Sequence, residues 1–559
     1  MAENRTFEAP GPGSWELETT HCSKPVSLYT QGFFASSLRR GFIEGTERYG
    51  LFLSYIKYVF VNGFTYMKPI LALVPEDAPP GPPPEGFFEQ PELLRRFENG
   101  PRAVAEKRWR EDLKRWDEEV KPDSIRRNQA LQDVQTGSLD SEALIEHLIS
   151  CYENLVEMWY RHHIFSVPGI FVTGLYLGKT CTWAGIETAE ALALLTGSTD
   201  VSRGLAEEEL DNLAGLLKQQ SIAPDQFSGQ PAAQVLETLR TMPVPIGPVV
   251  EQYLAIVGFQ LTSGYDITEQ YALEVPELLM GNIWSRVTKP IQQEDQAETR
   301  RRLDAVRNKI AIEHQNEFDT LLEEARFINR LRDERGLYGE AKAFGVARRA
   351  ILEAGKRLEQ AGQLGNRTLF LHASHPEMLA MLRGEDGPSN TELTTRQAWH
   401  ENQTINDVPP FLGSPPEPPP PPEALPEIAR LAETAIGTAL AQLFDNPDDE
   451  RSPDVIEGIA VSTGVYEGTA RLIKSPADFA RLQQGDVLVT KNTSATFNVV
   501  LPMLGAIVTD RGGQLSHAAI VSREYGIPGI VSTRNASRLI PDGARVRVDG
   551  EKGQVEILD

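Results

Sequence analysis

Cysteine is scarce in this sequence, and its scarcity excludes two kinds of small-domain architecture. The 559 residues contain three cysteines, Cys22, Cys151 and Cys181, which lie far apart. This spacing provides neither a disulfide framework nor the closely paired cysteines of a structural zinc site. So little cysteine is typical of a protein kept in a reducing compartment, and we predict a cytoplasmic location.

The sequence also lacks the features of a leader peptide or a membrane span. The first residues include Glu3, Arg5 and Glu8, which are unlike the basic and then apolar start of a signal peptide. The most apolar early run, 49–67, is interrupted by Lys57. We interpret this run as a buried helix and expect no membrane association.

An excess of basic charge is missing as well. Lys and Arg together number 55 against 79 Asp and Glu, so the formal net charge is -24. Because an acidic protein repels the phosphate backbone, we expect no nucleic-acid partner. The length predicts roughly three or four folded units with sizeable cores.

The most informative stretch that is present runs from 506 to 532. Residues 506–509 are apolar and largely β-branched, which is typical of a buried strand. Two glycines then permit a tight turn, and Ser516 is a favourable N-cap for a helix that ends at Gly526. A second apolar run follows. The pattern predicts strand, glycine turn, helix and strand, with His517 in the first helical turn.

The position of His517 has a chemical consequence. The first backbone N–H groups of a helix have no partner within the helix, and the helix dipole is positive there, so the site favours an anion. An imidazole at this point can accept a phosphoryl group, whose charge Gly512, Gly513 and Ser516 would hold. The alternative is that His517 only helps to cap the helix.

The longer pattern around His517 favours the chemical interpretation. Residues 512–528 contain Gly-Gly, Ser-His-Ala-Ala, Arg-Glu and Gly-Ile-Pro in that order. This run resembles the phosphohistidine motif of the phosphoenolpyruvate-utilising enzyme family, which includes phenylphosphate synthase and rifampicin phosphotransferase. The resemblance implies that His517 is the residue that becomes phosphorylated. Arg523 lies six residues along the helix, so we expect it to serve packing or docking.

Residues 1–407 read as a mainly helical domain, and the resemblance implies that it binds the acceptor. A Trp and His21 near the start resemble the beginning of that region in rifampicin phosphotransferase-like proteins. A helix predicted from about Ser141 ends near Trp159, His162 and His163. Two adjacent histidines could ligate a metal, but no third ligand has helical spacing, so we expect substrate-orienting or structural histidines and no metal.

A charged, helical region follows from 292 to 360. Within it, Arg332, Asp333 and Arg335 resemble the family's helix that approaches the transferred phosphate. Two guanidinium groups there could clamp a phosphoryl group, and Asp333 could orient or deprotonate an acceptor hydroxyl. A salt-bridged surface helix is the alternative. Gln260 stands where relatives carry an arginine, which puts a phosphate-facing role at that position in doubt.

Proline divides the chain before its last domain. Residues 408–453 form a Pro-rich linker with a hinge helix at roughly 424–444, as a domain that must travel would require. The prolines could instead recruit a proline-binding partner. Residues 454–559 contain short β-like runs and a final hairpin. The predicted class is α+β, multidomain: a large mainly α-helical acceptor-binding domain, the linker and a small α/β swivelling phosphohistidine domain.

The resemblance also implies modules that the sequence does not contain. No glycine-rich phosphate loop with a lysine and acidic metal ligands is present, and no βα-repeat region follows the histidine domain. We therefore expect ATP and Mg²⁺ to be bound mainly by a partner ATP-grasp subunit. The predicted function is transfer of a phosphoryl group from His517 to a small phenolic compound. The alternatives are a component of an antibiotic phosphotransferase and a phosphohistidine carrier or regulatory protein.

Overall fold

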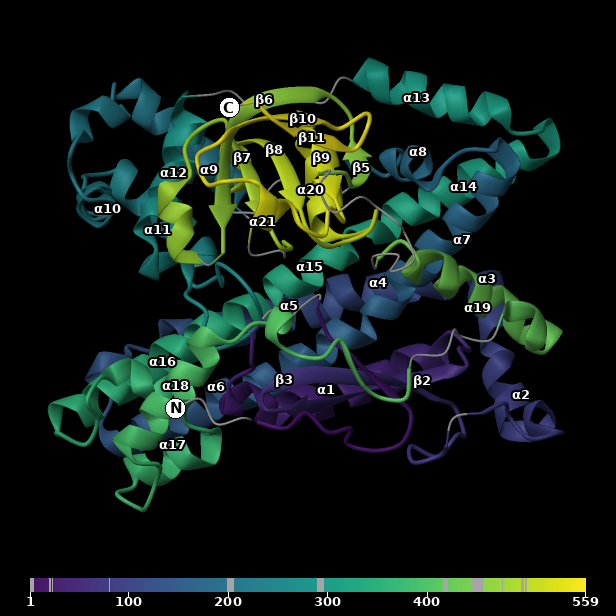
Figure 1. Ribbon diagram of the computed structural model, residues 1–559. Helices are drawn as coiled ribbons and strands as arrows, with labels where there is room; N and C mark the ends of the chain where they lie inside the picture. Colours follow the sequence, from purple (N-terminus) through teal and green to yellow (C-terminus); the bar gives the residue numbers. More distant parts are fainter. Residues whose placement is uncertain are drawn as a thin grey trace. The chain divides into compact units, whose positions relative to one another are not determined.

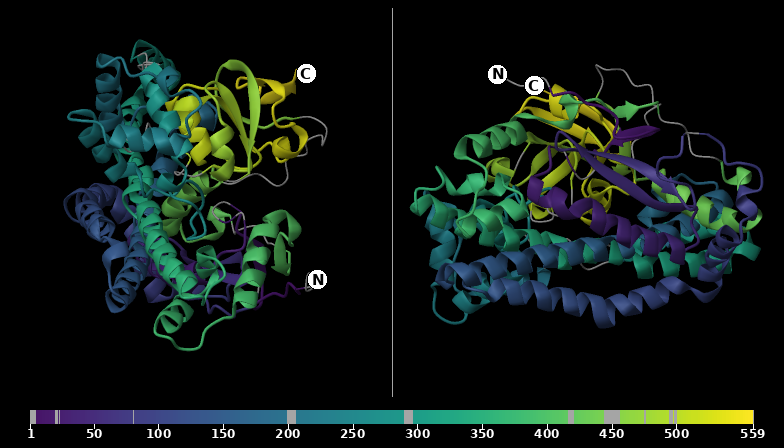
Figure 2. Two further views of the ribbon diagram at one scale, coloured as in Figure 1. Left: turned by 90° about the vertical axis from the view of Figure 1, so that its left-hand side faces the viewer. Right: turned by 90° about the horizontal axis from the view of Figure 1, so that it is seen from below.

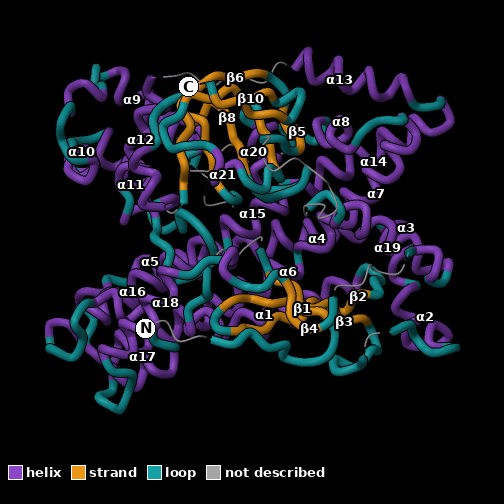
Figure 3. The backbone as a smooth tube through the Cα atoms, in the orientation of Figure 1, coloured by secondary structure: helices purple, strands orange, loops and turns teal. Residues whose placement is uncertain are grey.

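The computed structural model describes residues 5–19, 22, 24–79, 81–198, 206–288, 296–415, 421–443, 456–474, 476–493, 497 and 500–558. Helices predominate, and the strands form two sheets (Figures 1 and 3). The α+β, multidomain class predicted from the sequence is confirmed.

By their internal contacts the residues group into two compact units. The first unit comprises Met1–Phe171, Gly264–Glu269 and Tyr338–Thr434. The second comprises Val172–Ser263, Gln270–Leu337 and Ala435–Asp559. Helices from the middle of the chain thus group with the C-terminal residues. The boundaries predicted at 407 and 454 stay predictions.

The first unit contains a helical body and a small sheet. Its helices are α1 (Leu28–Arg48), α2 (Pro91–Phe97), α3 (Asn99–Glu106), α4 (Arg108–Arg115), α5 (Lys121–Asp133), α6 (Ser141–Ile164), α16 (Glu340–Gln360), α17 (His375–Leu382) and α18 (Asn390–Asn402). Its strands are β1 (Ser14–Leu17), β2 (Leu53–Val61), β3 (Phe64–Leu71) and β4 (Phe411–Gly413). Two further helices, α7 (Ser166–Ala184) and α19 (Glu427–Leu440), have residues in both units.

The four-stranded sheet of the first unit corrects one prediction. Its order is β2-β3-β1-β4, and all three pairings are antiparallel. The interpretation of 49–67 as a buried helix is wrong, because these residues form β2 and the start of β3. The reason is local: Asn62 and Gly63 have φ values of +53° and +88°, as a tight hairpin turn requires, and aromatic and β-branched residues flank them.

Three long helices form the core of the first unit. α1 packs against α6 and against the strand β2, and α16 packs against α6 (Figure 2). Large aromatic side chains fill the contacts, including Tyr29, Phe33 and Phe344, which are at most 1% exposed. The stretch Ser141–Ala184, comprising α6 and α7, is long and apolar enough to cross a membrane, but 72% of its most apolar window is buried in the protein.

The second unit combines helices with the larger sheet. Helices that lie wholly or mainly in it are α8 (Thr188–Ala193), α9 (Glu207–Gln219), α10 (Ala232–Arg240), α11 (Ile246–Val257), α12 (Pro276–Thr288), α13 (Gln296–Lys309), α14 (Ile312–Asn329), α15 (Leu331–Tyr338), α20 (His517–Glu524) and α21 (Ala536–Leu539). Its strands are β5 (Ile459–Ser462), β6 (Val465–Ile473), β7 (Asp486–Thr490), β8 (Leu504–Thr509), β9 (Gly529–Val531), β10 (Arg545–Asp549) and β11 (Gln554–Ile557). The helical region predicted at 292–360 is thus four helices, of which α16 belongs to the first unit.

The seven-stranded sheet has the order β11-β10-β6-β7-β8-β9-β5. β6, β7, β8 and β9 run in parallel, and the remaining strands are antiparallel to their neighbours. Side chains alternate between two cores: Leu488 and Ile507 pack on one face, and Val487 and Val508 on the other. Burial on both faces explains why the central strands are almost continuously apolar. The strands and the final hairpin predicted after 454 are confirmed.

The Pro-rich segment has more structure than predicted at its start. Residues 411–413 form β4, which pairs with β1 at the edge of the first sheet. An edge position suits a strand that follows two prolines, because it needs hydrogen bonds on one side only. The predicted hinge helix is α19. The residues 416–420 and the polar break predicted at 446–449 lie outside the described residues.

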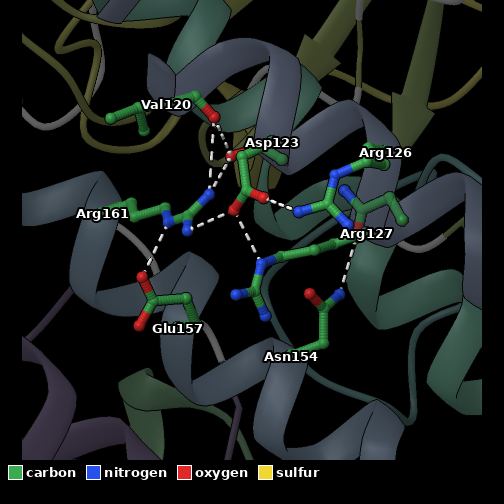
Figure 4. Close-up of polar contacts among 9 residues, drawn as sticks. Val120, Asp123, Arg126, Arg127, Asn154, Glu157 and Arg161 are labelled. Carbon is green, nitrogen blue, oxygen red and sulfur yellow. Dashed lines mark hydrogen bonds and ion pairs between the residues drawn. The ribbon is translucent and has the colours of Figure 1, made fainter. Parts of the chain in front are cut away.

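A polar network fastens α5 to α6 in the first unit (Figure 4). The guanidinium of Arg161 donates to Asp123 at 2.7 Å and to Glu157 at 2.8 Å. Arg127 donates to the same Asp123 oxygen at 2.7 Å. Burial of this carboxylate opposes its ionisation, but the hydrogen bonds from Arg161 and Arg127 outweigh burial and lower the pKa of Asp123 to about 2.

Replacing Asp123 with Asn should destabilise the first unit by about 1 kcal/mol at pH 7, a value reduced for solvent screening because the carboxylate is 24% exposed. The folded-state pKa lies below the unfolded value of about 3.9, so the stabilisation is complete above pH 4 and is lost as the pH falls toward 2. Urea denaturation at pH 7 and pH 3 measures this difference. The control is Asp133→Asn, an exposed carboxylate on the same helix. An equal effect of both substitutions, or an undiminished difference at pH 3, would contradict the assignment.

Candidate functional site

His517 lies at the carboxyl-terminal ends of two neighbouring parallel strands. β7 ends at Thr490 and β8 at Thr509, and these two residues are directly paired. The segments that leave the strands stay together, because the amide of Arg511 donates to the carbonyl of Lys491 at 2.9 Å. The carboxyl ends of parallel strands are where α/β domains usually bind their ligands.

A short turn, which we call the histidine loop (residues 512–516), connects β8 to α20. Gly512 has a φ of +113°, and a Cβ atom there would lie 2.8 Å from that of Ser516. The turn therefore requires glycine. The hydroxyl of Ser516 accepts a hydrogen bond from the amide of Ala519 at 3.4 Å and so caps α20. His517 is the first helical residue, as the sequence predicts.

Backbone carbonyls beyond α19 hold the histidine loop. The amide of Gly513 donates to the carbonyl of Leu443 at 3.3 Å. The amide of Leu515 donates to the carbonyl of Gln442 at 2.8 Å. Because its amide already has an acceptor, Gly513 can bind phosphate only after it leaves Leu443. The phosphate-binding roles of Gly512, Gly513 and Ser516 stay predictions.

Two arginines hold the same loop through its carbonyls. Arg332 of α15 donates to the carbonyl of Leu515. Arg523 of α20 donates to the carbonyls of Gln514 at 2.7 Å and Val461 at 3.2 Å. Burial and the nearby charge of Arg332 lower the pKa of Arg523 to about 10. These contacts agree with the packing role expected for Arg523.

The imidazole of His517 is half-buried and held at one nitrogen. Its Nδ1 atom lies 2.9 Å from the hydroxyl oxygen of Thr493, which follows β7. Burial, and secondly the positive charge of Arg332, lower the pKa of His517 to about 3. His517 is therefore neutral near pH 7, and a neutral imidazole retains the lone pair that nucleophilic attack needs.

α15 carries the three residues predicted to act on the phosphoryl group or its acceptor. Arg332 contacts the loop, while Asp333 and Arg335 are half-buried on the same short helix. Their roles toward a phosphoryl group or an acceptor stay predictions. Gln260, which replaces the family's arginine, is 5% exposed and donates to the carbonyl of Leu337 at 3.0 Å, so it supports the end of α15.

The predicted acceptor residues of α6 come together in the first unit. The rings of Trp159 and His162 are stacked with centroids 5.8 Å apart, and the ring of His163 lies 4.8 Å from that of His162. The Nδ1 atom of His162 lies 2.6 Å from a carboxylate oxygen of Glu340. His21 lies outside the described residues, so its predicted contact with the substrate stays a prediction.

Sequence reasoning did not identify the residues that contact Nδ1 of His517 and Nδ1 of His162, which are Thr493 and Glu340. Thr493 belongs to a polar segment directly after a buried strand, and that position is the signal that could have identified it. Glu340 lies 178 positions from His162, and no local pattern joins them. Among the described residues, no group of three or more His, Cys, Asp or Glu side chains is placed to hold a metal ion.

The fold and the His517 site together define the class of the C-terminal part. An α/β domain that presents a neutral imidazole at a helix N-terminus, near two guanidinium groups, suits transient attachment of a phosphoryl group. Residues 482–553 match the family described as PEP-utilising enzyme, mobile domain. The resemblance found in the motif around His517 is therefore confirmed over these residues.

Three relatives extend the comparison. The chain is 28% identical over 317 residues to an uncharacterized phosphotransferase, YvkC, of Bacillus subtilis, with 55% of this chain and 36% of that protein covered. It is 43% identical over 105 residues to the rifampicin phosphotransferase of Bacillus cereus, covering 19% and 12%. It is 26% identical over 607 residues to the chondramide synthase of Chondromyces crocatus, covering 100% and 14%. The chain thus spans no more than 36% of the length of these relatives.

The low pKa predicts that His517 remains neutral across the physiological range. Its ring proton resonances should not titrate between pH 8 and pH 5 in NMR spectra assigned by comparison with His517→Ala. Arg332→Ala should raise the pKa of His517, because it removes a positive charge that opposes protonation. The pKa should stay below 6.5, because burial is the larger cause. A wild-type midpoint near 6.5 would contradict this description of the site.

Proposed function

We propose that the protein is a phosphotransferase subunit that carries a phosphoryl group on His517 from ATP to the hydroxyl group of a phenolic compound. A separate ATP-grasp subunit binds ATP and Mg²⁺, and residues of the first unit bind the acceptor. The observation that carries the proposal is the neutral, half-buried His517 in a domain of the PEP-utilising enzyme mobile family. The relatives whose names include phosphotransferase support the reaction class.

The contact with Thr493 selects the nitrogen that attacks. When Nδ1 of His517 carries the proton and donates to the Thr493 hydroxyl at 2.9 Å, the lone pair is on Nε2. We therefore assign the phosphoryl group to Nε2. The hydroxyl also fixes the orientation of the ring, which is the usual role of a partner on the second nitrogen of a functional histidine.

Arg332 has a second role once the phosphoryl group is in place. Its guanidinium now donates to the carbonyl of Leu515, a neutral acceptor two residues before His517. A phosphoryl dianion is a stronger acceptor and binds guanidinium groups through charge-assisted hydrogen bonds. We propose that Arg332 turns to the phosphoryl group, with Arg335 as a second cation and Asp333 orienting the acceptor hydroxyl.

A relay through His517 requires the domain 454–559 to move between its donor and its acceptor. We assign the Pro-rich region 408–453, which includes α19, as the tether, as the sequence predicts. The proposed overall reaction is of the dikinase type, in which AMP and phosphate are the co-products, as in phenylphosphate synthase. The two alternative functions differ from this proposal in the acceptor. A rifampicin-type enzyme would transfer the phosphoryl group to an antibiotic, and a phosphohistidine carrier would transfer it to no small molecule.

Removing the Thr493 hydroxyl should slow phosphorylation of His517. Thr493→Val preserves the side-chain shape but loses one hydrogen bond, worth about 1 kcal/mol, so the rate should fall about fivefold. The rate is measured with phosphoramidate as a chemical donor and mass spectrometry as the readout. Thr238→Val, which removes a hydroxyl that donates to the carbonyl of Gln234 on α10, is the control. An unchanged rate, or phosphorus NMR that places the group on Nδ1, would contradict the assignment.

His517→Ala should abolish both phosphorylation and product formation while the protein remains folded. The assay combines the protein, a co-purified ATP-grasp protein, ATP and a panel of phenols, and product is detected by mass spectrometry. His314→Ala, which removes a ring stacked on Trp183 elsewhere in the second unit, is the control. Phosphorylated phenol from His517→Ala would refute the relay. Wild-type transfer to rifampicin alone would favour the antibiotic enzyme, and stable phosphorylation without any transfer would favour the carrier.

A further inference from the structure

We propose that His162, held by Glu340, is the general base that takes the proton from an aromatic hydroxyl acceptor in the first unit. This inference rests on the proposed function and names the group that completes the transfer. Three features of the described residues support it: a buried imidazole–carboxylate pair, a cluster of aromatic rings beside it, and a buried indole N–H without an acceptor.

The imidazole–carboxylate pair joins two helices of the core. His162 lies near the end of α6 and is 8% exposed, and Glu340 opens α16 and is 0% exposed. The distance of 2.6 Å between Nδ1 of His162 and the Glu340 carboxylate is that of a strong hydrogen bond. A carboxylate at Nδ1 selects the tautomer with a basic Nε2 and stabilises the imidazolium that forms when Nε2 takes a proton.

Aromatic rings surround Trp159, which lies one helical turn before His162. The centroid of Trp159 lies 5.1 Å from that of Phe34, 5.5 Å from that of Tyr265 and 5.9 Å from that of Phe344. The cluster continues from Phe34 to Tyr58 and Phe60 of β2, both of which are half-buried. Phe34 and Phe344 are buried, whereas Tyr58, Phe60 and Tyr265 are half-buried. Half-buried rings beside a buried cluster can provide the stacking and edge contacts that hold an aromatic ligand.

The indole of Trp159 points to a ligand that completes the cluster. Trp159 is 3% exposed, and its Nε1 has no hydrogen-bond partner among the described residues. Buried N–H groups in folded proteins nearly always have an acceptor. The oxygen of a hydroxylated ring, or a polar substituent on it, would supply that acceptor beside the imidazole of His162. A phenol fits this site, because its ring can contact the aromatic side chains while its oxygen accepts from Trp159 and its hydroxyl proton faces His162.

The proposed step balances without a further reactant. The acceptor oxygen forms a bond to phosphorus as the bond between phosphorus and Nε2 of phosphorylated His517 breaks. The electron pair of the broken bond returns to the imidazole of His517, and the hydroxyl proton passes to Nε2 of His162. Glu340 is a positioning residue, because it acts through His162 and does not contact the acceptor.

The test uses two acceptors that differ in their need for a base. The full-length protein is phosphorylated on His517 with phosphoramidate, and a single transfer is followed with phenol, which is protonated at pH 7.5, or with 4-nitrophenol, which is largely ionised. His162→Gln and Glu340→Gln should slow transfer to phenol by about 100- to 10,000-fold and transfer to 4-nitrophenol by less than about tenfold. Glu353→Gln, which removes another carboxylate of α16, should match the wild type with both acceptors.

The outcomes separate this inference from the proposed function. If both variants transfer to phenol at the wild-type rate, or lose both acceptors equally, His162 is not the base although the proposed function survives. If the wild-type phosphorylated protein transfers to neither acceptor, the proposed function fails and the inference fails with it. Retained transfer to 4-nitrophenol shows in the same assay that each variant is folded.

The indole hydrogen bond is tested by binding. Trp159→Phe keeps an aromatic ring but removes the donor, so the Kd of phenol for the unphosphorylated protein should rise about tenfold. Trp183→Phe, at a tryptophan stacked on His314 in the second unit, is the control and should leave the Kd unchanged. An unchanged Kd for Trp159→Phe would exclude Trp159 from the acceptor site.

Discussion

The parallel pairing of β7 with β8 is the constraint on which the His517 site depends. Both strands are buried on both faces, so their register is fixed by the two cores that flank the sheet. Fixed register brings Thr493, which follows one strand, within 2.9 Å of His517, which follows the other. The glycine turn and the cap of Ser516 then decide only the direction in which the imidazole points.

The electrostatics of this site favour a neutral imidazole and a charged product. Burial and the charge of Arg332 both oppose protonation of His517, which preserves its lone pair. We propose that the same arginine binds the phosphoryl group once it is attached. One cation can therefore serve the nucleophile before the reaction and the intermediate after it, without any change in its own protonation.

His517 and His162 each have a partner at Nδ1, but the two partners differ in charge. In the second unit a neutral hydroxyl contacts Nδ1 of His517, which orients the ring without adding charge. In the first unit a buried carboxylate contacts Nδ1 of His162, which orients the ring and fixes its tautomer. The first arrangement suits a nucleophile that must also become a leaving group. The second suits a residue that accepts and keeps a proton during transfer.

The sequence by itself determined the local features of this protein: the unit around His517, its cap, the strands after 454 and the helix that carries Trp159 and His162. These follow from short-range rules of turn, cap and periodicity. The helix predicted at 49–67 was wrong. That prediction rested on apolar content, whereas the turn at Asn62–Gly63 makes these residues a β-hairpin. Only the tertiary structure joined Thr493 to His517, Arg332 to the histidine loop and Glu340 to His162, because strand register and helix packing set contacts between residues distant in the chain.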